Sequence, residues 1–467
     1  MADFTVDETT IPGLLRVELP LHGDNRGWFK ENWQREKMLA LGLPDFGPVQ
    51  NNMSLNQSAG ATRGIHAEPW DKLVSIATGR IFGVWVDLRE GDTFGQVYTT
   101  ELGPETAVFV PRGVGNGYQT LVDGTVYSYL VNDHWSAEAR GSYTFVNLAD
   151  QTLAIQWPIT LDRAELSDQD RRHPALDDVT PFPRRKTLVV GATGQVGRAL
   201  CDLLPDADAA ARPRFDLGDP STFDTIAWGD YDTIVNAAAF TAVDEAETKD
   251  GRPSAWEVNA TAVGRLIELA RRHRLTFVHM SSDYVFDGRE DLHREDEPFS
   301  PLGVYGQTKA AGDALVSAHT EHYIVRTSWV IGDGNNFVRT MASLADKGVS
   351  PSVIDDQFGR LTFTSDIARA IVHLVGSDAP FGTYNLTSSG PVQSWADIAA
   401  TVFEARGRPA SDVHRVSTAD YASGKAVAPR PTHSTLDLTK IEATGFKPVD
   451  GPSYLGRYLE QLPNADD

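Results

Sequence analysis

The pattern of apolar and polar residues changes once along the chain, near residue 186. Before that point, short runs of β-branched and aromatic residues alternate with Gly, Pro and Asp at hairpin-like spacing. These runs occupy 72–89, 96–102, 106–113, 125–131 and 153–158. No long helical period follows residue 42 in this half. The pattern predicts an all-β first domain over residues 1–161, a sandwich or jelly-roll barrel.

After residue 186 the apolar period alternates between strand and helix. Residues 186–204 predict strand, turn and helix, 232–240 a buried strand, 258–273 an amphipathic helix and 275–286 another strand. Strands alternating with helices favour an α/β Rossmann-type, doubly wound parallel sheet over 186–467, with a small substrate-binding subdomain. The charged, proline-bearing stretch 162–185 predicts a linker between the two domains.

Composition narrows the classes of function. A length of 467 residues predicts two or three domains. The formal charge of −22 disfavours nucleic acid and anionic membranes as partners. No uncharged apolar run reaches the length of about 18 residues that a membrane span needs, and the N-terminus lacks the pattern of a secretory signal. The single cysteine, Cys201, fits a reducing cytoplasm.

The glycine-rich turn GATGQVG at 191–197 follows the first strand of the second half. Its three glycines allow close approach of backbone amides to a pyrophosphate and close packing of the helix on the strand. Downstream, Arg212 and Arg214 stand where an adenosine ribose is expected, and a guanidinium there suits the 2′-phosphate of NADPH. A solvated surface arginine is the alternative interpretation, and NADH the alternative cofactor. The predicted cofactor-binding residues are Gly191, Thr193, Gly194, Gln195, Val196, Gly197, Arg212, Asp216, Ala237, Ala238 and Ala239.

Three residues predict carbonyl reduction. Tyr305 and Lys309 are four apart, on one face of a helix, and Ser282 ends a strand. The tyrosine can supply the proton that the developing alkoxide needs, and a nearby ammonium would lower the pKa of that phenol. Lys309 can also hold the nicotinamide ribose, and Ser282 can hydrogen-bond the substrate oxygen. Tyr305 and Lys309 therefore count as both catalytic and cofactor-binding.

Nearly all of 186–460 resembles the extended short-chain dehydrogenases, and within them the dTDP-4-dehydrorhamnose reductase family. The resemblance rests on GATGQVG, SSDYVFDG (281–288), SPLGVYGQTKAAGDALV (300–316), VRTSWVIG (325–332) and VIDDQFGRLT (353–362). It implies Ser282, Tyr305 and Lys309 as the catalytic residues, with serine where the family usually has threonine. It also implies a sugar-nucleotide pocket shaped by Trp329, Asn336, Phe337 and Gln357.

The first half gathers basic residues around one histidine. Arg63, His66 and Lys72 lie within ten residues, and Arg26 lies in DNRGWFKE (24–31). Such cations are what an anionic ligand would need in a chain of this charge. Asp150 could orient a histidine through one ring nitrogen. A structural histidine is the alternative interpretation of His66.

Residues 5–160 resemble the dTDP-4-dehydrorhamnose 3,5-epimerase family, a cupin-type jelly roll. The matches are DNRGWFKE, QNNMS (50–54), RGIH (63–66), KLV (72–74), VDLR (86–89) and IQWP (155–158). By resemblance, His66 would be the base, Asp150 its partner and Lys72 the stabiliser of the enolate. The substrate-binding set that it implies is Arg26, Phe29, Glu31, Gln50, Asn52, Arg63, Asn116 and Trp135.

The first half departs from that family at three points. Trp135 stands where the family has an acidic tyrosine, Asn116 replaces a histidine, and the loop between His66 and Lys72 is shorter. Tyr129, His134 or Tyr143 could supply the missing acid. The epimerase activity could therefore be altered, limited to one carbon, or lost.

The two resemblances concern consecutive steps of one pathway, which favours a bifunctional enzyme that epimerises dTDP-4-dehydro-6-deoxy-D-glucose and then reduces it with NADPH to dTDP-L-rhamnose. Fusion would fix the stoichiometry of the two activities. We expect a dTDP-sugar substrate, a homodimer, and no nucleic-acid or membrane partner. No metal site is predicted, and a need for Mg²⁺ is left open. The alternatives are a reductase with a non-catalytic binding or dimerisation domain, a regulatory second half without turnover, and a UDP-sugar or 6-deoxytalose product.

Overall fold

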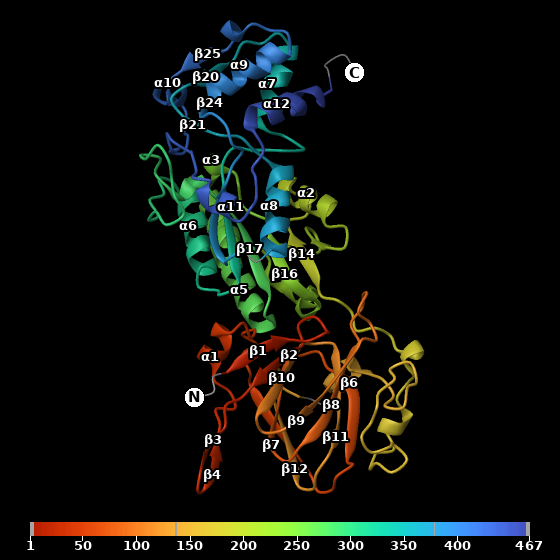
Figure 1. The fold of residues 1–467 in the computed structure, drawn as a ribbon. Helices are drawn as coiled ribbons and strands as arrows, with labels where there is room; N and C mark the ends of the chain where they lie inside the picture. Colours follow the sequence, from red (N-terminus) through yellow and green to blue (C-terminus); the bar gives the residue numbers. More distant parts are fainter. Residues whose placement is uncertain (1–3, 136–137, 378, 464–467) are drawn as a thin grey trace. The chain divides into compact units, whose positions relative to one another are not determined.

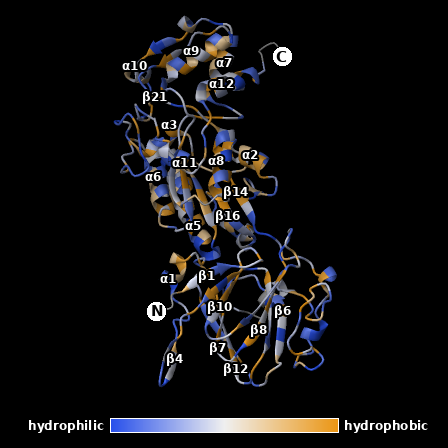
Figure 2. Ribbon diagram, in the orientation of Figure 1, coloured by the Kyte–Doolittle hydropathy of each residue, from blue (hydrophilic) through white to orange (hydrophobic). Residues whose placement is uncertain are grey.

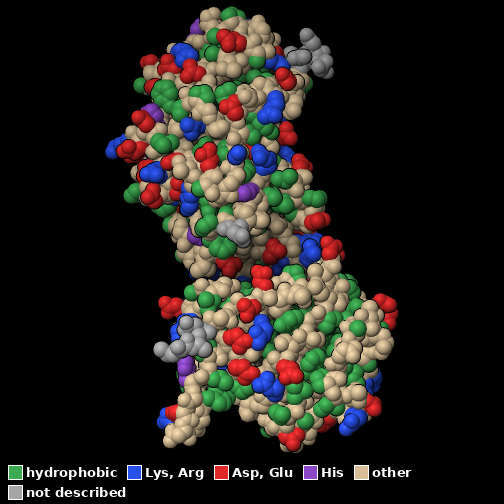
Figure 3. Space-filling model, viewed as in Figure 1, with side chains coloured by type: hydrophobic (Ala, Val, Ile, Leu, Met, Phe, Trp, Pro, Cys, Tyr) green, Lys and Arg blue, Asp and Glu red, His purple; other side chains and the backbone are tan. Residues whose placement is uncertain are grey.

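The structure, a computed structural model, describes residues 4–135, 138–377 and 379–463. Contacts divide the chain into two compact units, Met1–Arg184 and Arg185–Asp467 (Figure 1). Among the described residues, no helix combines the length and apolar character that crossing a membrane requires. On the face that Figure 3 shows, acidic and basic side chains are interspersed rather than gathered by sign.

The first unit consists of two antiparallel sheets, as its β-rich sequence predicts. One sheet has the order β1 (Thr5–Glu8), β2 (Leu15–Glu18), β10 (Thr106–Val110), β7 (Lys72–Thr78), β12 (Thr125–Val131), β5 (Gln50–Asn56). The other has the order β13 (Thr144–Phe145), β6 (Thr62–Ala67), β11 (Val114–Thr120), β8 (Ile81–Asp87), β9 (Val97–Leu102). A separate hairpin of β3 (His22–Asp24) and β4 (Gly27–Phe29) projects away from both sheets, and one short helix, α1, spans Arg35–Ala40.

Side chains from both sheets share one buried core. Val74 of β7 and Val108 of β10 pack with Trp85 of β8 and Tyr118 of β11. Successive residues of a strand point to opposite faces, so Val74 and Val108 enter this core while their neighbours Leu73 and Phe109 join a separate apolar cluster on the other face. The strands β5, β7, β12, β6 and β11 thereby bring their inward polar side chains into the same interior, where the candidate site of this unit lies.

The segment that follows the strands belongs to the first unit, which corrects two expectations. Residues 162–184, predicted as a linker, lie within the first unit, and Leu176 and Val179 join the apolar cluster on the second sheet with Val84 and Val86. Residues 153–158, predicted as a strand, form turns and loop. The linker prediction was wrong because this segment is mostly charged and proline-bearing, and the few apolar side chains that attach it to the second sheet are scattered among those residues.

The second unit is built on a six-stranded sheet in which every neighbouring pair is parallel, as predicted. Its order is β15 (Asp208–Ala210), β14 (Lys186–Val190), β16 (Tyr231–Asn236), β17 (Thr276–Ser282), β18 (His322–Thr327), β23 (Gly382–Leu386). These strands are among the apolar parts of the ribbon in Figure 2. Continuous apolar strands are typical of parallel sheets buried on both faces.

Helices cover both faces of this sheet. Leu200 of α2 and Ile371 of α8 pack on one face, and Leu266 of α5 and Val316 of α6 pack on the other. The helices are α2 (Gln195–Leu203), α3 (Val243–Ala246), α4 (Gly251–Trp256), α5 (Ala262–His273), α6 (Val304–Val316), α8 (Thr364–Gly376) and α11 (Thr439–Ala443). A π-helical turn, Glu257–Thr261, joins α4 to α5.

The second unit contains a smaller apolar cluster of its own, separate from the clusters on the parallel sheet. Val338 of α7, Phe403 of α9 and Leu459 of α12 share its core. Its elements are α7 (Phe337–Asp346), α9 (Trp395–Ala405), α10 (Thr418–Ala422), α12 (Gly451–Glu460), and the strand pairs β19 (Val330–Ile331) with β22 (Thr362–Phe363), β20 (Ser352–Ile354) with β25 (His414–Val416), and β21 (Phe358–Gly359) with β24 (Gln393–Ser394).

Candidate functional sites

The glycine-rich turn of the second unit lies between β14 and the N-terminus of α2. Gly191 has φ +80°, and a side chain there would come within 2.7 Å of the Ala238 backbone nitrogen. A side chain at Gly197 would collide with the carbonyl oxygen of Gly191. The third glycine therefore permits the close packing of helix on strand that the sequence predicts, and the first glycine permits a tight turn.

A cavity of about 700 Å³ opens beside this turn. It is lined by residues from the carboxyl ends of β14, β16, β17 and β18, where ligands bind in open parallel sheets. The predicted cofactor-binding, catalytic and substrate-binding residues that line it are Gly191, Thr193, Gly194, Gln195, Val196, Arg212, Asp216, Ala237, Ala238, Ala239, Ser282, Tyr305, Lys309 and Trp329.

The three predicted catalytic residues of this unit meet in the cavity. Ser282 ends β17, and Tyr305 lies in the first turn of α6 and hydrogen-bonds the serine hydroxyl. Lys309, one turn further along the same helix, is 1% exposed. Its ammonium donates a hydrogen bond of 2.6 Å to the Met280 carbonyl oxygen and lies 3.2 Å from His279 Nε2.

The electrostatics of this trio differ from the prediction in one respect. Burial raises the pKa of Tyr305 to about 12, and the hydrogen bond with Ser282 does not offset it. Burial also lowers the pKa of Lys309 to about 8. The expected lowering of the phenol's pKa by the lysine is not found, because Lys309 is directed to Met280 and His279. A phenol with this pKa keeps its proton at neutral pH, which is the form that donates.

Four residues predicted to shape the sugar pocket have different surroundings. Trp329 lines the cavity and stacks on Trp395 with ring centroids 3.7 Å apart. Asn336 caps α7 by accepting from the Arg339 backbone nitrogen, and Phe337 packs against Trp395.

Gln357, the fourth of these residues, is 4% exposed. Its side-chain nitrogen donates to the Thr418 hydroxyl over 3.1 Å. Of the four, Trp329 alone is among the described residues that line the cavity.

Sequence reasoning assigned no role to Asp283, which also lines the cavity. Its Oδ1 accepts a hydrogen bond of 2.9 Å from Ser282 Oγ. Burial raises the pKa of Asp283 to about 6, although hydrogen bonds with Ser434 and Ser282 act in the opposite direction. The signal was present, since this aspartate directly follows the predicted catalytic serine.

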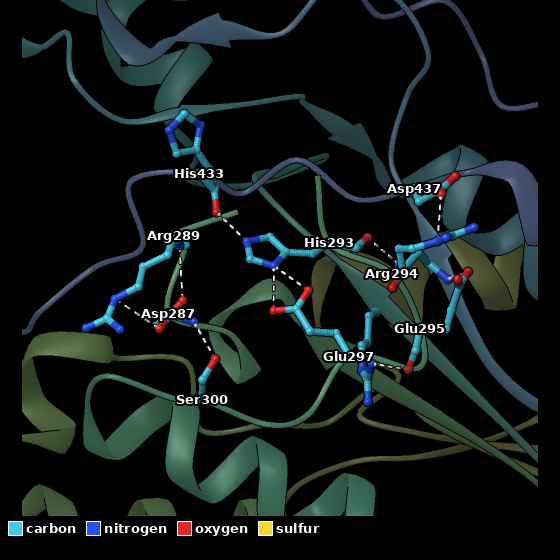
Figure 4. A network of polar contacts seen from close by, with 12 residues as sticks. Asp287, Arg289, His293, Arg294, Glu295, Glu297, Ser300, His433 and Asp437 are labelled. Atoms are coloured by element: carbon cyan, nitrogen blue, oxygen red, sulfur yellow. Dashed lines mark hydrogen bonds and ion pairs between the residues drawn. The ribbon is translucent and has the colours of Figure 1, made fainter. Parts of the chain in front are cut away.

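Residues 428–437, from late in the chain, contact the segment that carries Ser282 and Asp283, since Ser434 hydrogen-bonds Asp283 and Thr432 donates to the Gly288 carbonyl oxygen. Arg430 pairs with Asp244 at 2.9 Å. His293 is fully buried; its Nδ1 lies 2.9 Å from a Glu297 carboxylate oxygen, and its Nε2 lies 3.2 Å from the carbonyl oxygen of His433 (Figure 4). The carbonyl oxygen can only accept, so the imidazole carries a hydrogen on Nε2. These contacts pin two segments that are distant in sequence.

In the first unit, His66 of β6 and Lys72 of β7 are joined by a buried acid. His66 Nε2 lies 3.0 Å from Glu68 Oε1, and the other oxygen of Glu68 contacts the Lys72 ammonium. Lys72 also donates a hydrogen bond of 2.8 Å to Asn116 Oδ1. Asn116 in turn donates to the Tyr127 hydroxyl. The sequence predicted the histidine, the lysine and the asparagine, and it missed Glu68.

The acid partner of His66 is corrected. Burial and the Lys72 charge lower the pKa of His66 to about 3, while Asp170 acts to raise it. Asp150, the predicted partner, instead accepts from the Thr152 and Leu176 backbone nitrogens and makes no described contact with His66. Burial raises the pKa of Asp150, but these hydrogen bonds outweigh it and lower the pKa. The prediction for Asp150 was wrong because both of its carboxylate oxygens accept hydrogen bonds from backbone nitrogens of the turn and of Leu176.

Three other predicted ligand residues gather near Tyr129 of β12. Asn52 is directly opposite Tyr129 in the strand pairing and hydrogen-bonds it, and Gln50 donates to Asn52 over 2.8 Å. Arg63 is close enough to lower the pKa of Tyr129, although burial dominates and raises that pKa. This group brings an arginine and two amides to one end of the same interior.

Four predicted residues lie at exposed or half-buried positions. Arg26 is 84% exposed and pairs with Asp24, and Phe29 is 64% exposed on the projecting hairpin. Glu31 pairs with Lys37 at 2.5 Å.

Trp135, the fourth, is 59% exposed and donates its backbone N–H to Gln50 over 3.2 Å. Its side chain hydrogen-bonds Tyr143, whose ring stacks at 10° to His66.

Comparisons with known proteins match each unit separately. The family model for dTDP-4-dehydrorhamnose 3,5-epimerase matches residues 8–178, and the model for the RmlD substrate binding domain matches 185–463. A protein RmlC homolog of Streptococcus pyogenes is 52% identical over 177 residues, covering 37% of this chain and 89% of the relative. A dTDP-4-dehydrorhamnose reductase of Aggregatibacter actinomycetemcomitans is 38% identical over 285 residues, covering 57% of this chain and 95% of the relative.

A solved structure supports the second match. The dTDP-4-dehydrorhamnose reductase of Bacillus anthracis, in complex with NADP, is 29% identical, with a TM-score of 0.55, covering 60% of this chain and 99% of that one. The chain therefore belongs to two families at once, with a domain of the dTDP-4-dehydrorhamnose 3,5-epimerase family followed by a domain of the dTDP-4-dehydrorhamnose reductase family.

Proposed function

We propose that this chain carries out two successive steps of dTDP-L-rhamnose formation. The first unit would epimerise dTDP-4-dehydro-6-deoxy-D-glucose at carbons 3 and 5, and the second would reduce the 4-ketone of the product. Both domains are present in one chain. The observation that carries the proposal is the convergence of Ser282, Tyr305 and Lys309 with a glycine-rich turn in one cavity.

For the reduction, Tyr305 would donate the proton that converts the developing alkoxide to a hydroxyl. Ser282 would turn its single O–H from Asp283 to the ketone oxygen when the substrate is bound, and Lys309 would hold a ribose hydroxyl at the cavity wall. When bound, NADPH supplies the hydride. The buried surroundings of Tyr305, which is 9% exposed, exclude water from the proton that moves.

The residues present fit a dinucleotide. Gly191, where any side chain would collide with Ala238, makes the tight turn that leads into the N-terminus of α2, and backbone amides at a helix N-terminus suit phosphate oxygens. Arg212 lines the cavity with an exposed side chain. We infer a preference for NADPH from this guanidinium, with NADH as the weaker alternative. The sheet would then be the Rossmann type and the first unit a cupin-type jelly roll.

For the epimerisation, His66 would remove the protons next to the ketone. Its pKa of about 3 leaves the ring unprotonated at pH 7 but makes it a weak base, and Asp170 acts to raise its basicity. Lys72 would stabilise the enolate oxygen, and burial lowers the pKa of Lys72 to about 7. Arg63 would take a phosphate. Asp170, rather than Asp150, is the acid proposed to support the histidine.

A second candidate function is a reductase whose first unit only binds the sugar nucleotide. Glu68 favours it, because this carboxylate contacts both His66 and Lys72 and neutralises the lysine. Trp135 also favours it, because an indole donates protons poorly. Proton exchange at carbons 3 and 5 distinguishes the two candidates.

We also propose that the chain forms a homodimer through the first unit. The strand β5 lies at the edge of its sheet and exposes Met53 and Leu55 at 68% and 61%. The hairpin that carries Arg26 and Phe29 projects from its own sheets, so these residues would reach a site in a second copy (Figure 1). An exposed apolar edge strand is a surface that proteins normally cover.

One incubation tests the whole proposal. Purified protein is given dTDP-4-dehydro-6-deoxy-D-glucose in deuterated water, with and without NADPH, and the products are followed by NMR. Deuterium at carbons 3 and 5 without NADPH, and dTDP-L-rhamnose with it, are the expected results. If no deuterium exchange occurs, the chain has only the reductase activity. If a different reduced sugar forms, that sugar is the product in place of dTDP-L-rhamnose.

A further inference from the structure

Two buried hydroxyls in the cavity wall of the second unit lack hydrogen-bond partners. Thr327 ends β18, Ser281 is the last residue but one of β17, and each is 5% exposed. Both line the cavity beside the glycine-rich turn. Among the residues that the structure describes, none hydrogen-bonds Thr327 Oγ1 or Ser281 Oγ. An unpaired buried hydroxyl costs free energy of folding, so stability alone does not explain either side chain.

A threonine at this edge of the sheet can find an acceptor within the fold. Thr387 follows the neighbouring strand β23, is fully buried, and donates from Oγ1 to the Ser388 carbonyl oxygen over 3.0 Å. Thr327 is almost as buried and has no such acceptor. Valine fills nearly the same volume and suits a strand equally well, and it would carry no unpaired hydroxyl. The hydroxyl at position 327 thus calls for a partner that the fold does not supply.

Strand register places Thr327 beside the proposed catalytic serine. Ser282 and Thr327 are Cα partners in the parallel pairing of β17 with β18. Neighbouring strands lie about 4.8 Å apart, and the side chains of paired residues point to the same face of a sheet. The Thr327 hydroxyl therefore lies one strand away from the hydroxyl proposed to hold the ketone, on the same face.

Ser281 lies on the side of the site where the proposed ribose contact is. It directly follows Met280, whose carbonyl oxygen accepts a hydrogen bond of 2.6 Å from Lys309. Lys309 is the residue proposed to hold a ribose hydroxyl. The two unpaired hydroxyls are thus next to Ser282, one along its own strand and one across on the neighbouring strand.

The nicotinamide nucleoside has the chemistry to satisfy both hydroxyls. Hydride transfer brings carbon 4 of the nicotinamide ring to within about 3–3.5 Å of the ketone carbon. The carboxamide is attached to the adjacent carbon 3, so it lies close to the same point. It has an oxygen that accepts and an amino group that donates, and a hydroxyl can pair with either. The ribose adds hydroxyls that can pair with a serine in the same way.

We propose that Ser281 and Thr327 bind the nicotinamide nucleoside of the dinucleotide, with Thr327 at the carboxamide and Ser281 at the ribose. The glycine-rich turn would hold the pyrophosphate, and these two hydroxyls would fix the other end so that carbon 4 faces the ketone. The inference deepens the proposed reductase function and rests on it for the identity of the ligand. The lack of partners within the described residues does not depend on that function.

The first test compares Thr327→Val with the wild-type chain, without and with cofactor. We expect the Tm of the free second unit to rise by about 2 °C, because an unpaired hydroxyl is removed with little change of volume. The affinity for NADP⁺, measured by isothermal titration calorimetry, should fall about tenfold, since the bound carboxamide loses its partner. An equal or lower Tm would show that the hydroxyl is paired within the fold, and an unchanged affinity would remove it from the site. Either result overturns the proposal.

Thr387→Val is the matched control, because the same substitution there removes a hydroxyl that is paired. It should lower the Tm and leave the affinity for NADP⁺ unchanged. Scanning calorimetry of the full chain assigns the transition of the second unit by its upward shift with NADP⁺. A loss of NADP⁺ affinity in this control equal to that in Thr327→Val would show that any change at this edge disturbs the site, and it would overturn the assignment.

A fragment of the cofactor locates the effect. Adenosine 2′,5′-bisphosphate has the adenosine and the 2′-phosphate of NADP⁺ but no nicotinamide nucleoside. Its affinity should be the same in wild type, Thr327→Val and Ser281→Ala, while the affinity of both variants for NADP⁺ falls. Equal losses for NADP⁺ and the fragment would place the effect at the other end of the cofactor and overturn the proposal. An unchanged NADP⁺ affinity with a raised KM for the ketosugar would do the same, because it would assign the hydroxyls to the substrate.

The proposed reductase function fails in a different way. A wild-type chain that binds NADP⁺ but does not oxidise NADPH with any supplied ketosugar would end that function. The affinities for NADP⁺ and for the fragment would still decide whether Ser281 and Thr327 hold the nicotinamide nucleoside, so the two failures are distinguishable.

Discussion

Ser282 Oγ donates a hydrogen bond of 2.9 Å to Asp283 Oδ1, which places a buried carboxyl directly behind the hydroxyl proposed to hold the ketone. Asp283 is 2% exposed. Its carboxyl is costly to ionise, and its hydrogen-bond partners Ser282 and Ser434 compensate in part. This residue is retained at an energetic disadvantage in the wall of a functional cavity, as is typical of active sites.

Asp283→Asn should therefore stabilise the second unit. Burial raises the folded-state pKa from 3.8 to about 6, so the folded chain binds more protons than the unfolded chain between these values, and wild-type stability falls as pH rises through that window. At pH 8 the variant should gain about 2 kcal/mol in free energy of unfolding. The gain should close as pH falls from 6 to 4. Calorimetry at pH 8 and pH 4.5 measures it, and an equal or lower Tm of the variant at pH 8 would contradict the assignment.

Tyr305→Phe should abolish NADPH oxidation with little change in stability, because the phenyl ring fills the same buried space. Loss of the proton donor should lower kcat by about 100-fold or more. The first unit provides the control, since deuterium wash-in without NADPH should proceed at the wild-type rate. Oxidation within about tenfold of wild type would show that another group supplies the proton.

Asp170→Asn should slow deuterium exchange at least about tenfold, because the acid that supports the basicity of His66 is removed. Asp150→Asn is the matched variant: it makes the same chemical change at the residue that accepts from Leu176 and Thr152. It should lower the Tm and leave the exchange rate of the folded protein unchanged. The reverse ranking of the two variants would restore Asp150 as the partner of the histidine.

Trp135→Tyr should raise the rate of deuterium exchange if the epimerisation by the first unit is limited by the lack of a proton donor at position 135. The side chain is 59% exposed, so a smaller ring fits without strain. Exchange is measured by NMR in deuterated water, with Trp135→Phe as the control that lacks a proton donor. An unchanged rate in the tyrosine variant would identify another acid, for which Tyr143, stacked on His66, is the first to substitute.

Arg212→Ala should reduce the preference for NADPH over NADH. A guanidinium paired with a 2′-phosphate contributes about 1.5–3 kcal/mol, so the ratio of kcat/KM values should fall by about 10- to 100-fold. The change should come from KM for NADPH, with KM for NADH nearly unchanged. Arg214→Ala, two residues away and absent from the cavity lining, is the control. An unaltered ratio in Arg212→Ala would leave the arginine as a solvated surface residue.

The sequence predicts the parallel sheet, the glycine turn and the catalytic trio of the second unit because each depends on local pattern: buried strands, glycines without side chains, and a spacing of four on a helix. It predicts the two-sheet character of the first unit for the same reason. It does not predict the hydrogen bond that Asp150 accepts from the Leu176 backbone nitrogen, since that contact joins residues far apart in sequence. Glu68 and His279 escaped notice because their importance comes from neighbours on other strands.

The expected acidity of Tyr305 shows a different limit. Spacing placed Lys309 on the same helix face, but the sequence gives no measure of burial or of where the amine points. Burial raises the pKa of the phenol, and the Lys309 side-chain nitrogen contacts the Met280 carbonyl oxygen and His279 Nε2. The linker expectation failed similarly, because few apolar residues in 162–184 sufficed to attach that segment to the second sheet.

Residues 428–437 contact the catalytic segment of the second unit, 281–288, through Ser434, which hydrogen-bonds Asp283, and through Thr432 and His433, which both donate to the Gly288 carbonyl oxygen. During synthesis on the ribosome, Ser282 emerges roughly 150 residues before these partners do. At the usual elongation rate of about 5–20 residues per second, the nascent reductase would wait on the order of ten seconds or more with its catalytic segment unfastened. Each newly made chain therefore becomes able to reduce substrate only late in its synthesis, whereas all strands of the epimerase domain have been synthesised long before that point.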